Sequence, residues 1–279
     1  KPGDELLRKA AARPLPQQRV FGAQFHAARK ARVRLAIFAD AHVAGRDADH
    51  HIALEQHLGG GKARIDIDAE RLWASLMALA RIGATPKGGV RRVTLTAEDR
   101  EGRECFARWC REAGLEVRVD AIGNMFARRA GRDAAAPPVV MGSHLDTQPN
   151  GGRFDGAYGV MAGLEIMRAL NDARSSTRAP LEVACWTNEE GSRFVPTMMG
   201  SGVFAGVYEL GEILQNRDGA GVSVGDALRS IGYRGEARPH KVAAYFEAHI
   251  EQGPVLEDTQ TTIGVVQGAL GQRWFDVLI

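Results

Sequence analysis

The sequence has few cysteines, few aromatic residues and no strong excess of either charge. Only three cysteines occur among 279 residues, and none belongs to a Cys-x-x-Cys pair. We expect them to be buried thiols in a reducing compartment, the cytoplasm. The 36 basic and 34 acidic residues leave a net charge of +2, which provides no basic surface for nucleic acid. Because no apolar run approaches the roughly 20 residues of a membrane helix, a globular protein without nucleic-acid or membrane partners is expected.

Residues 1–63 differ from the rest of the chain because they lack a clear hydrophobic period. They hold five of the eight histidines and end in a glycine-rich stretch that is typical of a linker. His50, His51 and His57 suggest a metal-binding tract, but no carboxylate or cysteine pattern accompanies them. We therefore expect an unassigned extension, either disordered or unrelated to the fold that follows.

Beyond this extension, capping residues and hydrophobic periods predict helices. Asp68 can cap a helix whose inward face carries leucines at every third or fourth position. Thr96 and Asp99 have the spacing of a capping box, so a second helix should begin there. Gly114 is a suitable residue to end it. A third, shorter helix is predicted over residues 224–231.

Strands are predicted between these helices. Residues 115–119 alternate apolar and polar side chains, as a half-buried strand does, and residues 122–127 are predicted to be its hairpin partner. The apolar runs 138–141 and 181–186 predict two buried strands, and a helical period separates them. Alternating helices and strands predict an α/β fold, with a mainly parallel sheet flanked by helices. Further strands are predicted over residues 245–254, 261–266 and 273–279.

A polar, glycine-rich loop follows the first of these buried strands. Residues 142–156 read GSHLDTQPNGGRFDG and contain His144, Asp146 and Asp155. Open α/β sheets place their ligand sites beyond the carboxyl ends of strands, and imidazole with carboxylate suits a divalent metal such as zinc. Asp146 is placed to accept the second ring N–H of His144. The alternative for this loop is an ordinary polar turn with a capping aspartate.

Two later segments favour the metal site. Glu189 and Glu190 directly follow the second buried strand, where adjacent carboxylates repel unless a cation or a shared proton lies between them. One can bind metal while the other acts as a general base. Farther on, Glu247, His249 and Glu251 alternate so that they would share one face of a strand. His249 is then a third candidate ligand, although a hydrogen-bonded strand histidine and a solvated Glu pair remain the ordinary alternatives.

Three segments carry a resemblance to a known family. GSHLDTQPNGGRFDG, TNEEGSRF and HIEQGP resemble segments of the zinc-dependent amidohydrolases that cleave N-carbamoyl amino acids, a hydantoinase/carbamoylase group within the M20 metallopeptidases. The group includes N-carbamoyl-L-amino-acid hydrolase, bacterial β-ureidopropionase and allantoate amidohydrolase. The resemblance runs from about residue 65 to residue 279. It implies the N-terminal part of a di-zinc aminopeptidase-like catalytic domain.

The resemblance also implies a role for each site residue. His144 and His249 would bind one zinc ion, Glu190 the other, and Asp155 would bridge them. Glu189 would be the general base, with Asp146 orienting His144. Gln252 would contact a small-molecule substrate, most simply an N-carbamoyl-L-amino acid that is hydrolysed to amino acid, ammonia and carbon dioxide. Allantoate and N-carbamoyl-β-alanine are alternative substrates, and Mn²⁺, Co²⁺ and Ni²⁺ are alternative metals.

The end of the sequence departs from the family pattern. The family completes its second metal site with a histidine near the C-terminus and forms homodimers through a separate lid domain, but no histidine follows His249 here. The resemblance therefore implies that residues 64–279 are a partial catalytic domain, truncated at its C-terminal end. We expect weak binding of the second metal and little activity from these 279 residues alone. An inactive metal-binding remnant is the alternative from a different functional class.

Overall fold

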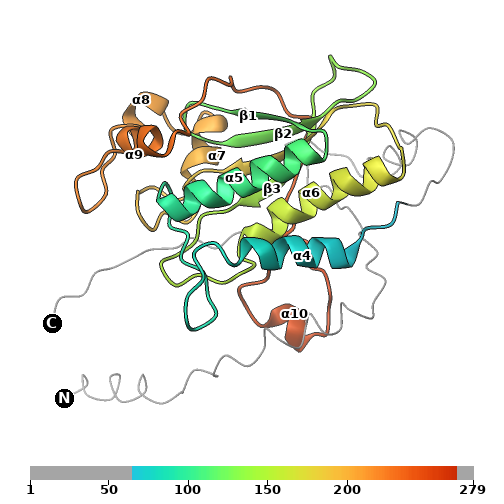
Figure 1. Ribbon diagram of the computed structural model, residues 1–279, viewed down its shortest axis with the longest axis horizontal. Helices are drawn as coiled ribbons and strands as arrows, with labels where there is room; N and C mark the ends of the chain where they lie inside the picture. Colours follow the sequence, from blue (N-terminus) through green and yellow to red (C-terminus); the bar gives the residue numbers. More distant parts are fainter. Residues whose placement is uncertain (1–64, 269–279) are drawn as a thin grey trace, which may run out of the picture. The chain divides into compact units, whose positions relative to one another are not determined.

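The computed structural model describes residues 65–268, all of which belong to one compact unit (Figure 1). The predicted extension, residues 1–63, and the predicted strand 273–279 lie outside the described residues. Among the described helices, none has the length and apolar character needed to cross a bilayer.

A five-stranded sheet forms the centre of the unit. Its strand order is β1 (Glu116–Val119), β2 (Met125–Arg129), β4 (Leu181–Trp186), β3 (Val139–His144) and β5 (Ala244–Phe246). β2 is antiparallel to both of its neighbours, whereas β3 is parallel to β4 and to β5. Four strands therefore share one direction and only β2 is reversed. The predicted hairpin is confirmed, and the predicted sheet is mixed, because two of its strand pairings are parallel and two are antiparallel.

Helices cover both faces of this sheet. On one face, α6 (Ala157–Asp172) packs on β3 and β4, α5 (Ala97–Glu112) packs on β1, and α4 (Ala69–Leu79) lies against α6 (Figure 1). On the other face, α7 (Met199–Phe204) places Phe204 against a buried cluster that includes Phe126 and Trp186. Three further helices are short: α8 (Leu210–Ile213), α9 (Val224–Ile231) and α10 (Val255–Asp258).

The predicted helix boundaries follow their capping residues. The Asp68 side chain accepts a hydrogen bond from the backbone N–H of Arg71, and Gly114 adopts a φ of 76° beyond α5. Thr96 caps α5 by accepting from the N–H of Asp99. The Asp99 carboxylate bonds the N–H of Leu95 at 2.7 Å, one residue before the position that a capping box requires. The box is therefore only half formed.

The predictions for the last part of the chain were less accurate. The strand predicted over residues 245–254 ends at Phe246, because its ladder with β3 extends over only three residue pairs. Glu247, His249 and Glu251 therefore do not share a strand face. Residues 261–266 form no strand. In the preceding segment, Met199 is buried, whereas Met198 is 56% exposed.

A buried carboxylate on β4 gathers three partners. His240 Nε2 lies 2.6 Å from Glu182 Oε2. The Glu182 side chain is fully buried on β4 and also binds Arg118 and Arg128, at 2.7 and 2.8 Å. Since a buried carboxylate must be paired, His240 completes its surroundings.

Two buried arginines connect the core to the loops at the carboxyl ends of the strands. Arg92 donates to the carbonyls of Leu145 and Ile82, at 2.7 and 3.1 Å. Arg103 pairs with buried Asp99 at 2.9 Å and donates to the Gly123 carbonyl at 2.7 Å. These bonds satisfy backbone carbonyls that would otherwise be buried without partners.

We predict that Arg103→Ala lowers the free energy of unfolding by about 3–5 kcal/mol, because it leaves Asp99 charged, buried and unpaired. Arg100→Ala is the matched control on the same helix. Its ion pair with Glu104 is half exposed and screened by solvent, so its loss should change stability far less than the loss of Arg103. Urea unfolding of the two variants measures both effects, and equal losses would contradict the assigned role of Arg103.

Candidate metal centre

Three candidate ligands converge at the carboxyl ends of the strands. His144 is the last residue of β3, Asp155 precedes α6, and His249 lies three residues beyond β5. His249 Nε2 is 3.2 Å from Asp155 Oδ1, and His144 Nε2 is 4.0 Å from the same oxygen. One ligand atom from each residue lies within 4.8 Å of the other two. Two imidazoles and a carboxylate at this spacing can hold one divalent ion.

Glycine at position 156 allows this convergence. A Cβ atom built on Gly156 would lie 2.4 Å from the His144 ring, and the residue has a φ of 62°. Any side chain would therefore displace the imidazole and strain the backbone. Gly159 serves a similar purpose one turn later, because its Cβ would meet the Ala248 carbonyl at 2.6 Å. The start of α6 thus packs directly against the ends of β3 and the segment that carries His249.

The main-chain carbonyl and the side-chain carboxylate of Asp146 contact different residues. The Asp146 carbonyl oxygen lies 2.9 Å from His144 Nδ1, whereas its carboxylate lies 3.8 Å from that nitrogen. The carbonyl accepts the ring N–H and leaves Nε2 free to face Asp155. The carboxylate instead accepts the backbone N–H groups of Glu189 and Glu190, each at 3.3 Å. The sequence indicated the residue that orients His144 but not the atom.

Glu189 and Glu190, which follow β4, have different neighbours. Glu189 Oε2 lies 3.5 Å from His144 Nε2. Glu190 Oε2 accepts a hydrogen bond of 2.8 Å from Gln148, while its Oε1 is buried without a hydrogen-bond partner. Asn188 turns the chain between strand and glutamates in a left-handed conformation, with a φ of 51°, and its amide donates to the Phe194 carbonyl. Asparagine tolerates this conformation better than most residues.

Gln252 also reaches the site. Its Nε2 donates to Asp155 Oδ2 at 2.7 Å. The residue predicted to contact substrate therefore lies beside the predicted bridging carboxylate. All six of the other predicted residues lie in the same region: His144, Asp146, Asp155, Glu189, Glu190 and His249.

Burial and neighbouring charges shift the pKa values of several side chains in the site. The hydrogen bond to Asp155 raises the pKa of His249 to about 9. Burial opposes protonation of His144, but the nearby carboxylates of Asp146 and Glu189 outweigh it, so the pKa of His144 is also raised. Burial, followed by repulsion from Glu190, raises the pKa of Glu189. Burial raises the pKa of Asp146 to about 6.

The donor chemistry fits a metal ion. Nitrogen and carboxylate oxygen ligands suit zinc and related divalent ions, and a buried carboxylate oxygen without a partner, as in Glu190, calls for a compensating cation. Gln148 and Asn188 had not been singled out in the sequence. Their position within the two motif loops was the available signal.

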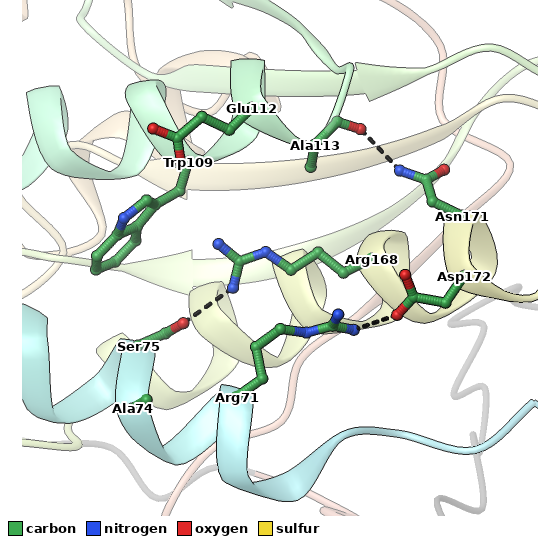
Figure 2. A pocket seen from close by; sticks show the side chains of 9 residues that line it. All are labelled: Arg71, Ala74, Ser75, Trp109, Glu112, Ala113, Arg168, Asn171 and Asp172. Atoms are coloured by element: carbon green, nitrogen blue, oxygen red, sulfur yellow. Dashed lines mark hydrogen bonds and ion pairs between the residues drawn. The ribbon is translucent and has the colours of Figure 1, made fainter.

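The pocket shown in Figure 2 is separate from this centre. It is a pocket of about 540 Å³ between α4, α6 and the C-terminal end of α5. Arg168 crosses it to donate to Ser75, and Asn171 donates to the Ala113 carbonyl. No candidate metal ligand lines this cavity.

Metal binding at this centre should release protons, because only a neutral imidazole can coordinate. In the metal-free protein the raised pKa of His249, about 9, keeps this side chain protonated at pH 7. Its ion pair with Asp155 stabilises that form fully below the ordinary pKa of about 6.5, and this stabilisation is lost as the pH rises through 9. We predict that metal affinity rises up to about tenfold per pH unit over this interval.

Calorimetry in buffers of different ionisation enthalpy measures the protons released by each bound ion. The His249→Ala variant should release fewer protons than the unmodified protein. Affinity that does not change between pH 6.5 and 9 would contradict the assignment of His249 as a ligand.

The sequence is similar to a known protein family and to named relatives. The model of the peptidase family M20/M25/M40 matches residues 140–273. An N-carbamoyl-L-amino-acid amidohydrolase of Rhizobium meliloti is 51% identical over 212 residues, which are 75% of this chain and 51% of that protein. An allantoate amidohydrolase of Bacillus subtilis is 37% identical over 205 residues, which are 72% of this chain and 50% of that protein.

A solved structure supports the same relationship. The hydantoinase/carbamoylase family amidase from Burkholderia ambifaria superposes with a TM-score of 0.70 at 60% sequence identity, covering 70% of this chain and 48% of that one. The chain spans about half the length of the curated relatives it matches. Its motifs, fold and relatives agree, and the chain belongs to the M20 peptidase family, in the group of the hydantoinase/carbamoylase amidases.

Proposed function

We propose that this chain carries the metal centre of an amidohydrolase that cleaves a linear amide or ureido C–N bond. The observation that carries the proposal is the convergence of His144, Asp155 and His249 within 4.8 Å, with the Glu189 carboxylate 3.5 Å from His144. A metal centre with an adjacent carboxylate base is suited to hydrolysis with water as the nucleophile.

The proposed substrate is an N-carbamoyl-L-amino acid. The support is the 51% identity to the amidohydrolase of Rhizobium meliloti, whose name specifies this substrate. Allantoate is the second candidate, because the Bacillus subtilis relative is named for it. Both substrates present a ureido group, so the same centre suits either one. N-carbamoyl-β-alanine, the substrate of β-ureidopropionase, shares this group.

The proposed resident metal is zinc, with His144, Asp155 and His249 holding one ion. Glu190 would contribute to a second ion bridged through Asp155, which would compensate its unpaired buried oxygen. Mn²⁺, Co²⁺ and Ni²⁺ also accept this mixed nitrogen and oxygen set. A bound divalent metal supplies Lewis acidity, which acidifies water and polarises the carbonyl under attack.

Glu189 is the proposed general base. Burial and Glu190 raise the pKa of its carboxyl group, and a base is most effective when its pKa lies close to the working pH. The carboxylate takes a proton from the attacking water and gives it to the nitrogen that leaves. The bond between this nitrogen and the carbamoyl carbon breaks, and the carbamic acid so formed yields ammonia and carbon dioxide.

Neighbouring residues position these groups. Asp146 fixes the backbone of Glu189 and the ring of His144, so that the base and the ligand keep one relative orientation. Gln252 holds Asp155 through its amide nitrogen, which leaves its carbonyl oxygen available to a substrate N–H. We further propose a cytoplasmic homodimer acting on small molecules. The compartment is supported by the three free cysteines, all of them buried.

Glu189→Gln should reduce ammonia release from N-carbamoyl-L-amino acids by at least about 100-fold, because it removes the base. The change preserves side-chain volume, so bound metal measured by elemental analysis should be retained. Glu257→Gln is the matched control, because it removes an exposed charge from α10, and its activity should equal that of the unmodified protein.

Allantoate and N-carbamoyl-β-alanine are assayed in parallel to identify the substrate. Equal activity of Glu189→Gln and the unmodified protein would reject Glu189 as the base. Metal binding without ammonia release by these 279 residues is the outcome expected of a partial catalytic domain. The reaction is therefore tested in a chain that covers the full length of the relatives, and such a chain that binds metal but releases ammonia from none of these substrates would reject it.

A further inference from the structure

We propose that Glu247 is a positioning residue that holds His144 and His249 at the spacing a metal requires. The inference rests on the metal centre proposed above, and it concerns a side chain outside the ligand set. Glu247 lies just beyond β5, two residues before His249.

The Glu247 carboxylate connects two strand ends directly. The Ser143 hydroxyl donates to Glu247 Oε1 in a very short hydrogen bond, and Ser143 is the residue immediately before His144. The Tyr245 hydroxyl donates to Glu247 Oε2 at 2.7 Å. Both carboxylate oxygens are therefore used, one by β3 and one by β5.

A third strand joins this network through an aromatic side chain. Trp186 Nε1 donates to the Tyr245 hydroxyl at 2.8 Å, and Trp186 is the last residue of β4. Trp186 also packs against Tyr245 and Phe126, with ring centroids 5.9 and 5.8 Å apart. The network thus fixes the carboxyl ends of β3, β4 and β5, from which His144, Glu189 and His249 extend.

The hydrogen-bond ladder between β3 and β5 ends before it reaches His144 and His249. The β3–β5 ladder contains three residue pairs and ends at Met141 and Phe246. His144 and His249 each lie three residues beyond their member of that last pair. The distance between the two imidazoles, whose centroids are 6.0 Å apart, therefore depends on side-chain bonds, and those of Glu247 are placed to control it.

The test measures metal affinity and the geometry of the bound metal without using activity. Co²⁺ is titrated into metal-free protein, and its visible absorption reports coordination number and symmetry. Glu247→Ala should weaken Co²⁺ binding about 10–100-fold, as loss of an outer hydrogen bond does in other metal sites, and should shift the absorption spectrum.

Conservative variants separate positioning from general destabilisation. Glu247→Gln keeps the length and one acceptor oxygen, so it should recover most of the lost affinity. Tyr245→Phe and Ser143→Ala each remove one bond and should produce smaller losses. The double variant Ser143→Ala with Glu247→Ala should bind no more weakly than Glu247→Ala alone, since both changes remove the same bond. Glu257→Gln is again the charge control.

The outcomes separate this inference from the proposed function. Unchanged affinity and spectrum in Glu247→Ala would overturn the inference, as would a folded unmodified protein that binds no Co²⁺. Weakened binding in Glu247→Ala with recovery in Glu247→Gln would support it, even if the unmodified protein released no ammonia. Circular dichroism and thermal unfolding identify any variant that fails to fold, and the Tyr245→Phe titration then decides the question.

Discussion

The buried Asp146 carboxylate is the interaction on which the arrangement of the site depends. It accepts the backbone N–H groups of Glu189 and Glu190, and so joins the loop after β3 to the loop after β4. The side chain is almost fully buried, and this burial raises its pKa to about 6. The same residue presents its carbonyl to His144. The proposed ligand His144, the proposed base Glu189 and the carboxylate residue Glu190 are thus positioned by one side chain and its own backbone.

The sequence predicted those parts of the fold in which local and tertiary preferences agree. The helix capped by Asp68, the hairpin of β1 and β2, and the buried strands β3 and β4 appear where their patterns placed them. Residues 245–254 also alternate, but a ladder requires a partner, and β3 offers one only as far as Phe246. Pairing depends on distant residues, so alternation alone overestimated this strand.

For the candidate site too, the sequence predicted the general location but not every contact. The motif loops brought His144, Asp155 and His249 together because the carboxyl ends of parallel strands meet at one edge of the sheet. The sequence could not predict that the carbonyl of Asp146 contacts His144 while its carboxylate contacts the loop after β4. A sequence pattern identifies a residue but does not distinguish its main-chain atoms from its side-chain atoms. The buried pair of Arg103 and Asp99 was also missed, because a charged residue on an amphipathic helix is ordinarily solvated.

The short edge strand β5 has a consequence for how metal enters and leaves. Within residues 65–268, the segment that carries His249 is joined to the sheet by a three-residue ladder and by side-chain bonds, whereas His144 ends a strand that is paired on both sides. Segments with few buried contacts open locally at a much smaller free-energy cost than global unfolding. We therefore expect the segment that carries His249 to open more readily than the end of β3, so that metal exchange at the proposed centre would proceed by release of His249 before His144.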